Sequence, residues 1–494
     1  MKLKDRNKVT VLSPFFYVLF LLPALVGCAM HQPQPIDLPV PVPESFTEPS
    51  KMVSKQAVEH KIPIARWWKS FNDPKLNALM KEAFSKNLDL AQAYARLDQL
   101  EAVYRTTRSA QLPSLGIEGQ WSKENTPSFF GNNTGNSHIF SLAAGYELDL
   151  WQKLKSRTQA ANLEMAASQE EIMVIYLTIS AQLADNYYLA VEQRAQLELI
   201  DKTIDSFADT LARVEQRYRE GLVSALDVYQ AEQNLAIAKS QRPAFELSLA
   251  QAEHALAILL GHYPKHNSNM AGDLLKLPKA PAAFPAGLPS ELLARRPDVE
   301  AALFRLKASD ARIAVAIAER FPSFNLLGNY GTMSIVFSTG DIKGLFWKVL
   351  VDTAFPILDG GKRKAEVART KAVFRENLAF YHKTVLDAFK EVEDALVSNR
   401  TTEERIASLQ KRVEATGAAF HQTFQQYLQG LTDYLPVLAA KTVHLDAQRG
   451  VLAARRQLIS DRISLARALG GDWMKQELKN VMQEKQKKKK GRKS

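Results

Sequence analysis

A long internal repeat constrains this chain more than any other feature of its sequence. Identical residues recur 209 positions apart along most of the chain, and no gap is needed to align them. A period of this kind means that one supersecondary design is built twice. We expect repeat 1 over residues 73–264, a Pro- and Ala-rich linker over 265–288 and repeat 2 over 289–473. The pairs that define the spacing are Asp89 and Asp298, Arg96 and Arg305, Pro113 and Pro322, Lys153 and Lys362, Tyr218 and Tyr427, Gly221 and Gly430, and Gly261 and Gly470.

Each repeat begins with two segments in which apolar and polar residues alternate, as they do in strands with one buried face. We expect β-hairpins at about 112–149 and 321–358, with the Gly- and Asn-rich segment 125–137 as the loop of the first. The strands have about the 9–11 residues of a tilted membrane strand, and aromatic residues lie near their ends. Four strands cannot close a membrane barrel, since the smallest have about eight. Several copies of the chain must therefore contribute, unless the hairpins form the exposed sheet of an ordinary soluble protein.

A very long helical segment follows each hairpin. Residues 151–219 contain neither Gly nor Pro, and a helix of that length would reach roughly 100 Å. Small residues at heptad spacing allow close packing between helices. The chain reverses at Gly221 and Gly430, which predicts α-hairpins at about 151–261 and 360–470. The predicted fold class is thus mainly α with membrane β, and a coiled coil that only dimerises is the alternative.

The start of the chain has the features of a targeting signal. Basic residues, an apolar stretch and then LVGC followed by a Pro-rich segment predict a signal peptide over 1–27 and a lipidated N-terminal segment over 28–72. LVGC resembles the lipobox of bacterial lipoproteins, in which the Cys, here Cys28, becomes an acylated N-terminus that carries N-acyl, diacylglyceryl and palmitate chains. Ala29 follows it, which by the same resemblance indicates the outer membrane. A buried or redox thiol is the alternative, although a single Cys can form no internal disulfide.

Charge and motifs argue against nucleic-acid binding and catalysis. The net charge of +11 comes largely from residues 1–8 and from the basic C-terminal tail within 474–494, which leaves a nearly neutral body. No HExxH, GxSxG or Gly-rich phosphate loop occurs. We therefore predict no enzyme activity, no catalytic residue, no cofactor and no metal site. We interpret His262 and His266 as surface residues, and Asp352 and Asp359 as strand residues that face a lumen.

These features together resemble the TolC-like outer membrane factors, and most closely the NodT and OprM type of efflux lipoproteins. The resemblance implies a homotrimer with a twelve-stranded barrel and an α-helical periplasmic tunnel, a passive conduit for drugs or toxic compounds. A periplasmic adaptor (membrane fusion) protein and an inner-membrane transporter would be its partners. The alternatives are a type I secretion conduit and a lipid-anchored scaffold without a pore. The segments that carry the resemblance are RYREGLVSALDVYQAEQNLA, AILLG, QYLQGLTDYLPVLAA, ARALGGDW, YELDLWQKLK and FPILDGGKRK.

The same resemblance assigns roles at the two helical turns. It implies that the adaptor contacts the first tip through Gly221, Leu222, Val223 and Ser224, and the second through Gly430, Leu431, Thr432 and Asp433; a plain structural turn is the alternative.

The family's periplasmic gate has an apolar residue followed four positions later by Asp, and these positions hold Leu435 and Ala439 here. Asp227 or Asp433 could supply the missing charge, although an exposed turn Asp more often caps a helix. Pro436 is expected to perturb its helix. We expect a gate that is less sensitive to divalent cations than those of its relatives.

Overall fold

The structure is a computed structural model that describes residues 31–38, 41–43, 45–47, 66–128, 131–265, 276–285, 289–337, 340–355 and 357–491. The predicted signal peptide and Cys28 lie outside these residues. The chain divides into two compact units. We call residues 1–38, 96–168 and 301–382 the strand unit, and residues 39–95, 169–300 and 383–494 the helical unit.

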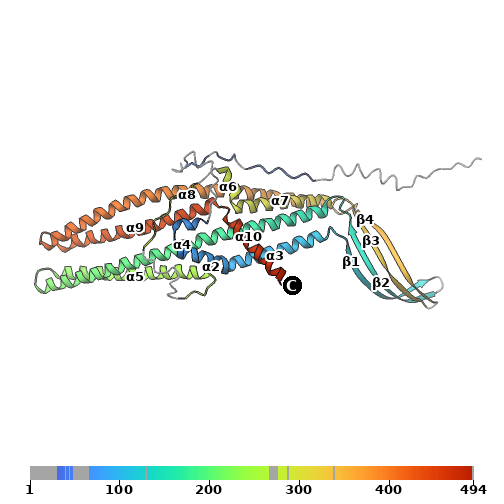
Figure 1. The fold of residues 1–494 in the computed structure, drawn as a ribbon, viewed down its shortest axis with the longest axis horizontal. Helices are drawn as coiled ribbons and strands as arrows, with labels where there is room; N and C mark the ends of the chain where they lie inside the picture. Colours follow the sequence, from blue (N-terminus) through green and yellow to red (C-terminus); the bar gives the residue numbers. More distant parts are fainter. Residues whose placement is uncertain are drawn as a thin grey trace, which may run out of the picture. The chain divides into compact units, whose positions relative to one another are not determined.

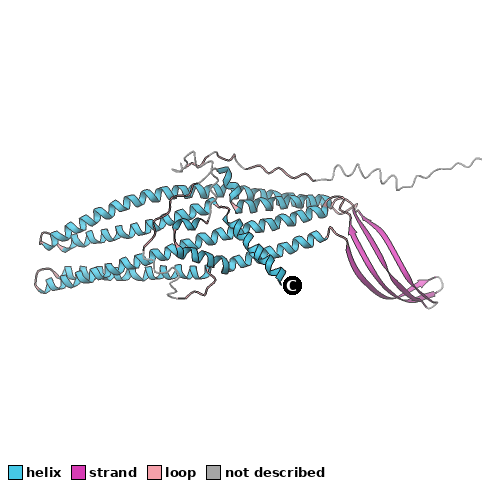
Figure 2. Cartoon of the chain, viewed as in Figure 1, coloured by secondary structure: helices cyan, strands magenta, loops and turns pink. Residues whose placement is uncertain are grey.

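The elements repeat in the same order (Figures 1 and 2). The helices α3 and α7, the strands β1 and β3, and the helices α4 and α8 each begin and end 209 residues apart, and α4 and α8 both have 67 residues. The predicted tandem repeat of a β-hairpin and a long α-hairpin is confirmed. The elements are η1 (Trp67–Phe71), α2 (Pro74–Lys86), α3 (Leu88–Ser109), β1 (Ser114–Ser128), β2 (Gly131–Glu147), α4 (Lys153–Arg219), α5 (Ala225–Leu259), α6 (Pro289–Arg295), α7 (Pro297–Ala318), β3 (Ser323–Phe337), β4 (Gly340–Ala354), α8 (Lys362–Leu428), α9 (Tyr434–Leu469) and α10 (Trp473–Gly491).

The strand unit contains one antiparallel sheet of order β1-β2-β3-β4. The two hairpins join through β2 and β3, whose ladder runs from Asn136 opposite Val336 to Glu147 opposite Asn325. Both repeats therefore contribute to a single curved sheet, and β1 and β4 form its two edges (Figure 2).

The predicted loop at 125–137 is wrong for most of its length. The β1–β2 ladder continues past Asn125 opposite Thr134 to Ser128 opposite Gly131. In an antiparallel hairpin the partner strand satisfies the backbone right up to the turn, so Gly and Asn remain in the sheet. Pro127 is the penultimate residue of β1, beside the turn, where the ladder ends.

The interpretation of Asp359 as a strand residue is also wrong, because β4 ends at Ala354. The Asp359 carboxylate instead accepts hydrogen bonds from the backbone N–H groups of Gly361 (3.0 Å) and Arg363 (3.2 Å) at the start of α8. Asp149 caps α4 in the same way, through Leu154 N (2.9 Å) and Lys155 N (2.8 Å). Carboxylates at helix N-termini satisfy free N–H groups and the positive end of the helix dipole.

The tail was predicted only as a basic segment, but the structure shows that it begins as a packed helix. On α10 the Trp473 ring meets Trp68 edge-on at 4.8 Å and stacks on Phe84 at 5.7 Å. Met474 and Leu478 are also buried. These apolar residues precede the C-terminal run of lysines that begins at Lys485, and they give the helix a face to bury. The charge count did not reveal this face. Further along, Lys485 Nζ lies 5.0 Å from the ring centre of Tyr94.

The described helices include none that is both long enough and apolar enough to span a bilayer.

We predict that Gly331→Ala destabilises the sheet, because a Cβ at this position would lie 2.2 Å from the Phe140 carbonyl oxygen and 2.6 Å from Ser141 Cα. The strands would have to separate, at a cost of about 1–3 kcal/mol. Thermal unfolding followed by circular dichroism would measure the loss. Gly116→Ala is the matched control, since a Cβ there meets nothing within 4 Å; equal melting of the two variants would contradict the prediction.

Candidate functional site

One face of the sheet is apolar, and its side chains are exposed in the single chain. The strand registers place Ile117, Leu142, Tyr330 and Trp347 in one row across all four strands. The neighbouring rows on the same face include Leu115, Val349, Phe140 and Leu345. The exposed fractions of Ile117 and Trp347 are 68% and 77%. An apolar surface of this extent requires an apolar environment, such as lipid.

The opposite face carries most of the charged and amide side chains of the sheet. Glu118 and Gln120 lie on this face of β1, Asn329 on β3, and Lys348 and Asp352 on β4. Polar side chains on one face and apolar ones on the other are the pattern of a membrane strand that lines an aqueous lumen. The sheet is the first part of the candidate site.

The two helical tips form the second part, and both lie in the helical unit. At the first tip Gly221 N donates to Tyr218 O (2.9 Å) and Leu222 N to Arg217 O (2.9 Å). The second repeats these bonds from Gly430 to Tyr427 (3.0 Å) and from Leu431 to Gln426 (2.9 Å). This pair of bonds defines a Schellman turn, which requires a left-handed residue. The φ angles of Gly221 and Gly430, +71° and +74°, explain the glycines.

A shared core brings the two tips together, as the neighbouring hairpin ends in Figure 1 show. The Arg217 guanidinium lies 4.8 Å from the ring centre of Tyr427, which itself packs at 5.7 Å on Tyr434. Val214 and Ala231 of the first hairpin belong to the same buried cluster as these tyrosines. The leucines of the tips remain outside it, with Leu222 62% and Leu431 72% exposed.

The two tips differ in how their second helices begin. Ser224 and Asp227 form a capping box in which Asp227 Oδ2 accepts from Ser224 N (2.9 Å) and Ser224 Oγ (2.8 Å). Asp433 is the N-cap of α9 but makes no side-chain cap hydrogen bond. Val223 and Thr432 are half-buried beside these caps. The Asp227 carboxylate thus holds the turn, whereas Asp433 is exposed.

The predicted gate positions lie one turn apart on α9. Leu435 and Ala439 are both exposed in the single chain. Pro436 does not perturb the helix, contrary to our expectation. Because α9 begins at Tyr434, the proline is its third residue, where no backbone N–H bond within the helix is lost.

Lys441, near the gate positions, was missed by the sequence analysis. Its Nζ donates to Ser206 Oγ at 2.7 Å and lies 4.4 Å from the ring centre of Phe207 on α4. Burial lowers the pKa of Lys441 to about 8, while the charge of Asp209 opposes this shift. No signal in the sequence marks this contact, because Ser206 and Phe207 lie more than 200 residues before Lys441.

The remaining candidate residues do not join the tips. His262 Nε2 lies 3.1 Å from Glu82 Oε1, and His266 falls outside the described residues. Among the residues that the structure describes, no group of His, Cys, Asp and Glu is arranged to hold a metal ion.

Comparison with known proteins matches nearly all of the repeated region. The family model described as "Outer membrane efflux protein" matches residues 79–262 and 288–471. The chain is 30% identical over 473 residues to the toluene efflux pump outer membrane protein TtgF of Pseudomonas putida, covering 91% of this chain and 95% of that protein. It is 29% identical over 482 residues to the cation efflux system protein CusC of Escherichia coli O6:H1, covering 94% and 98%.

Solved structures show the same fold. A membrane protein from Pseudomonas aeruginosa superposes with a TM-score of 0.79 and 27% identity, covering 90% of this chain and 100% of that one. The outer-membrane channel OprN gives a TM-score of 0.77 and 28% identity, covering 88% and 98%.

We predict that the free energy of unfolding rises between about pH 8 and pH 10 because Lys441 loses its proton in the folded protein. The folded-state pKa lies below that of an unfolded lysine, about 10.4, so the protonated amine opposes folding below about pH 8. This cost disappears as the pH rises through the interval between the two values. Urea unfolding at both pH values should show a gain on the order of 1 kcal/mol, allowing for partial exposure. Lys441→Met should abolish it; an equal gain in this variant would contradict the assignment.

Proposed function

Because the chain belongs to the outer membrane efflux protein family, we propose that it is the outer-membrane channel subunit of a tripartite efflux system, a passive conduit from a periplasmic pump to the exterior. The predicted family, outer-membrane location and role in efflux are confirmed by the relatives. Their names specify cargoes as different as toluene and cations. We propose small toxic molecules as the cargo class of this chain.

The two-faced sheet is the observation that carries the proposal. In hydrocarbon every backbone N–H and C=O must find a partner within the protein. Within one chain β1 and β4 are the sheet edges, so β4 of one copy must pair with β1 of the next. We propose a homotrimer, in which twelve strands close around a lumen lined by the polar face.

Single-channel recording from purified protein, together with its mass by native mass spectrometry, tests this function. A trimer that conducts ions supports the proposal. A stable assembly without conductance would favour the lipid-anchored scaffold. Restored export of a protein cargo in a strain without its secretion conduit, with no change in tolerance to solvents or antibiotics, would favour type I secretion.

We propose that the tips contact a periplasmic adaptor protein, which links the channel to an inner-membrane transporter. The support is geometric: two Schellman turns of the same design present Leu222 and Leu431 to solvent at one end of the helical unit. The residues assigned to this contact are Gly221, Leu222, Val223, Ser224, Gly430, Leu431, Thr432 and Asp433.

We further propose that Cys28 carries the lipid anchor in the outer membrane. His31 Nε2 lies 2.8 Å from Asp310 Oδ1 on α7, and Gln34 N donates to the same oxygen at 3.3 Å. His31 and Gln34, three and six residues after Cys28 in the sequence, are thus bonded to α7. Because α7 precedes β3 in the strand unit, these bonds connect the segment that follows Cys28 to the unit that contains the sheet. Cys28→Ser should remove the acyl mass from the mature protein; an unchanged mass would overturn the assignment.

We predict that the proposed gate at Leu435 and Ala439 is less sensitive to divalent cations than the gates of its relatives, and that Ala439→Asp makes it more sensitive. Three added carboxylates on the threefold axis would create an oxygen site that divalent cations favour. Conductance of the reconstituted variant should fall in micromolar divalent cation, whereas the natural chain keeps its conductance. Ala439→Asn is the uncharged control. A sharp fall of the natural chain's conductance would refute the prediction.

A further inference from the structure

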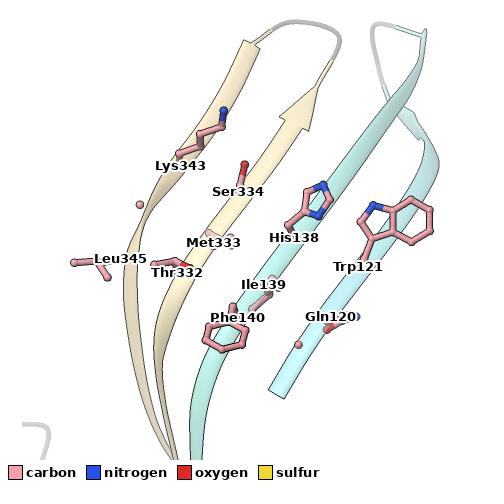
Figure 3. A pocket seen from close by; sticks show the side chains of 12 residues that line it. Gln120, Trp121, His138, Ile139, Phe140, Thr332, Met333, Ser334, Lys343 and Leu345 are labelled. Carbon is pink, nitrogen blue, oxygen red and sulfur yellow. The ribbon is translucent and has the colours of Figure 1, made fainter. Parts of the chain in front are cut away.

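A hollow lies on the apolar face of the sheet, towards the hairpin turns. It has a volume of about 730 Å³ and is bordered by Trp121, His138, Phe140, Ser334 and Lys343 (Figure 3). All four strands contribute to it, and it lies wholly within the strand unit.

The strand registers divide its border into a polar and an apolar row. Trp121, His138, Ser334 and Lys343 lie opposite one another and form the row nearer the turns. The next row towards the helices holds Gly119, Phe140, Thr332 and Leu345. Gly119 leaves its position on this face empty, and a Cβ there would meet only Phe140 Cδ2, at 3.9 Å. Hydrogen-bond donors thus meet apolar surface at one level of the sheet.

This change from apolar to polar rows is the pattern of a membrane edge. The apolar rows from Val349 to Phe140 suit acyl chains, and Trp121 beside His138, with ring centres 6.5 Å apart, suits the interfacial zone. Within the strand unit the hairpin turns lie at the opposite end of the sheet from the strand ends that connect to α3, α4, α7 and α8. With those helices on the periplasmic side, this edge would face the outer leaflet.

The polar row is positively charged at its β4 end. Lys343 Nζ lies 3.2 Å from Asp341 Oδ2, and their side chains are 64% and 45% exposed. An exposed pair of this kind is weak and exchanges readily with other partners. Asp341 belongs to the row one step nearer the turns, and Lys123 occupies the β1 position of that same row. An anion at the hollow would therefore meet the Lys343 ammonium with the Ser334 hydroxyl and the His138 ring beside it.

We propose that this hollow binds a phosphorylated glycolipid of the outer leaflet, an inference that rests on the proposed membrane role of the sheet. Lys343 contacts a headgroup phosphate, with Ser334 and His138 as further donors. The acyl chains follow the apolar rows past Phe140 and Leu345. Charge complementarity and the continuity of the polar row with the apolar face favour a lipid over a soluble anion, which would leave the apolar half uncovered.

Native mass spectrometry of the assembled channel, titrated with lipid A that carries both phosphates, tests the proposal. Lys343→Gln should weaken binding about tenfold, since it removes a charge-assisted hydrogen bond. Asp341→Asn should strengthen binding, because it removes the competing carboxylate. Lys348→Gln is the matched control: it makes the same change on the same strand, but on the polar face.

Three outcomes would overturn the inference. One is equal binding by Lys343→Gln and Lys348→Gln. Another is equal affinity for dephosphorylated lipid A, and the third is displacement of the lipid by millimolar inorganic phosphate, which would indicate a site for free anions. Single-channel conductance of the same samples distinguishes failure of the lipid site from failure of the proposed channel function. A conducting channel without these differences refutes only the lipid site, whereas a channel that does not conduct counts against the proposed function.

Discussion

Backbone hydrogen bonding in hydrocarbon is the constraint on which the rest of the structure depends. A strand in lipid cannot leave its N–H and C=O groups unpaired, and a sheet of four strands has two open edges. Within the chain, the β2–β3 ladder joins the two hairpins, so the inner edges of both have a partner. The demand that remains falls on β1 and β4, which makes self-association part of the fold. The duplication is therefore a way to halve the number of subunit joints around the lumen.

The long α-hairpins meet the same requirement for backbone hydrogen bonds in a different way. Helices satisfy their own backbone, so α4 and α8 need only side-chain packing, and both have the same length. Equal lengths bring both turns to the same end of the helical unit, where the Tyr427 and Tyr434 cluster joins them. The turns have the same backbone but different chemistry, with a capping box at Ser224 and an open N-cap at Asp433. A partner could therefore distinguish the two hairpins even though their geometry is shared.

The sequence predicted what depends on periodicity and missed what depends on individual contacts. The 209-residue spacing and the alternation around Ile117 predicted the repeat and the faces of the sheet, because both signals extend over many residues. The loop predicted from local composition at 125–137 was wrong, since cross-strand pairing overrides the loop preference of Gly and Asn. Asp359 and Pro436 were misjudged because an error of a few residues in a helix start changes a residue's role. Lys441 was not recognised at all, because the residues that it contacts, Ser206 and Phe207, are distant in sequence.

The packing of α10 against η1 and α2 has a consequence for biogenesis. Trp473 meets Trp68, and Glu477 pairs with Arg66, across more than 400 intervening residues. The aromatic core around η1 and α2 is therefore complete only after α10 has been made and has packed on it. Until then Trp68 and Phe84 remain open to solvent or to other chains, which is the condition under which partly made proteins aggregate. This part of the molecule is therefore exposed to aggregation for longer than helices whose partners are close in sequence.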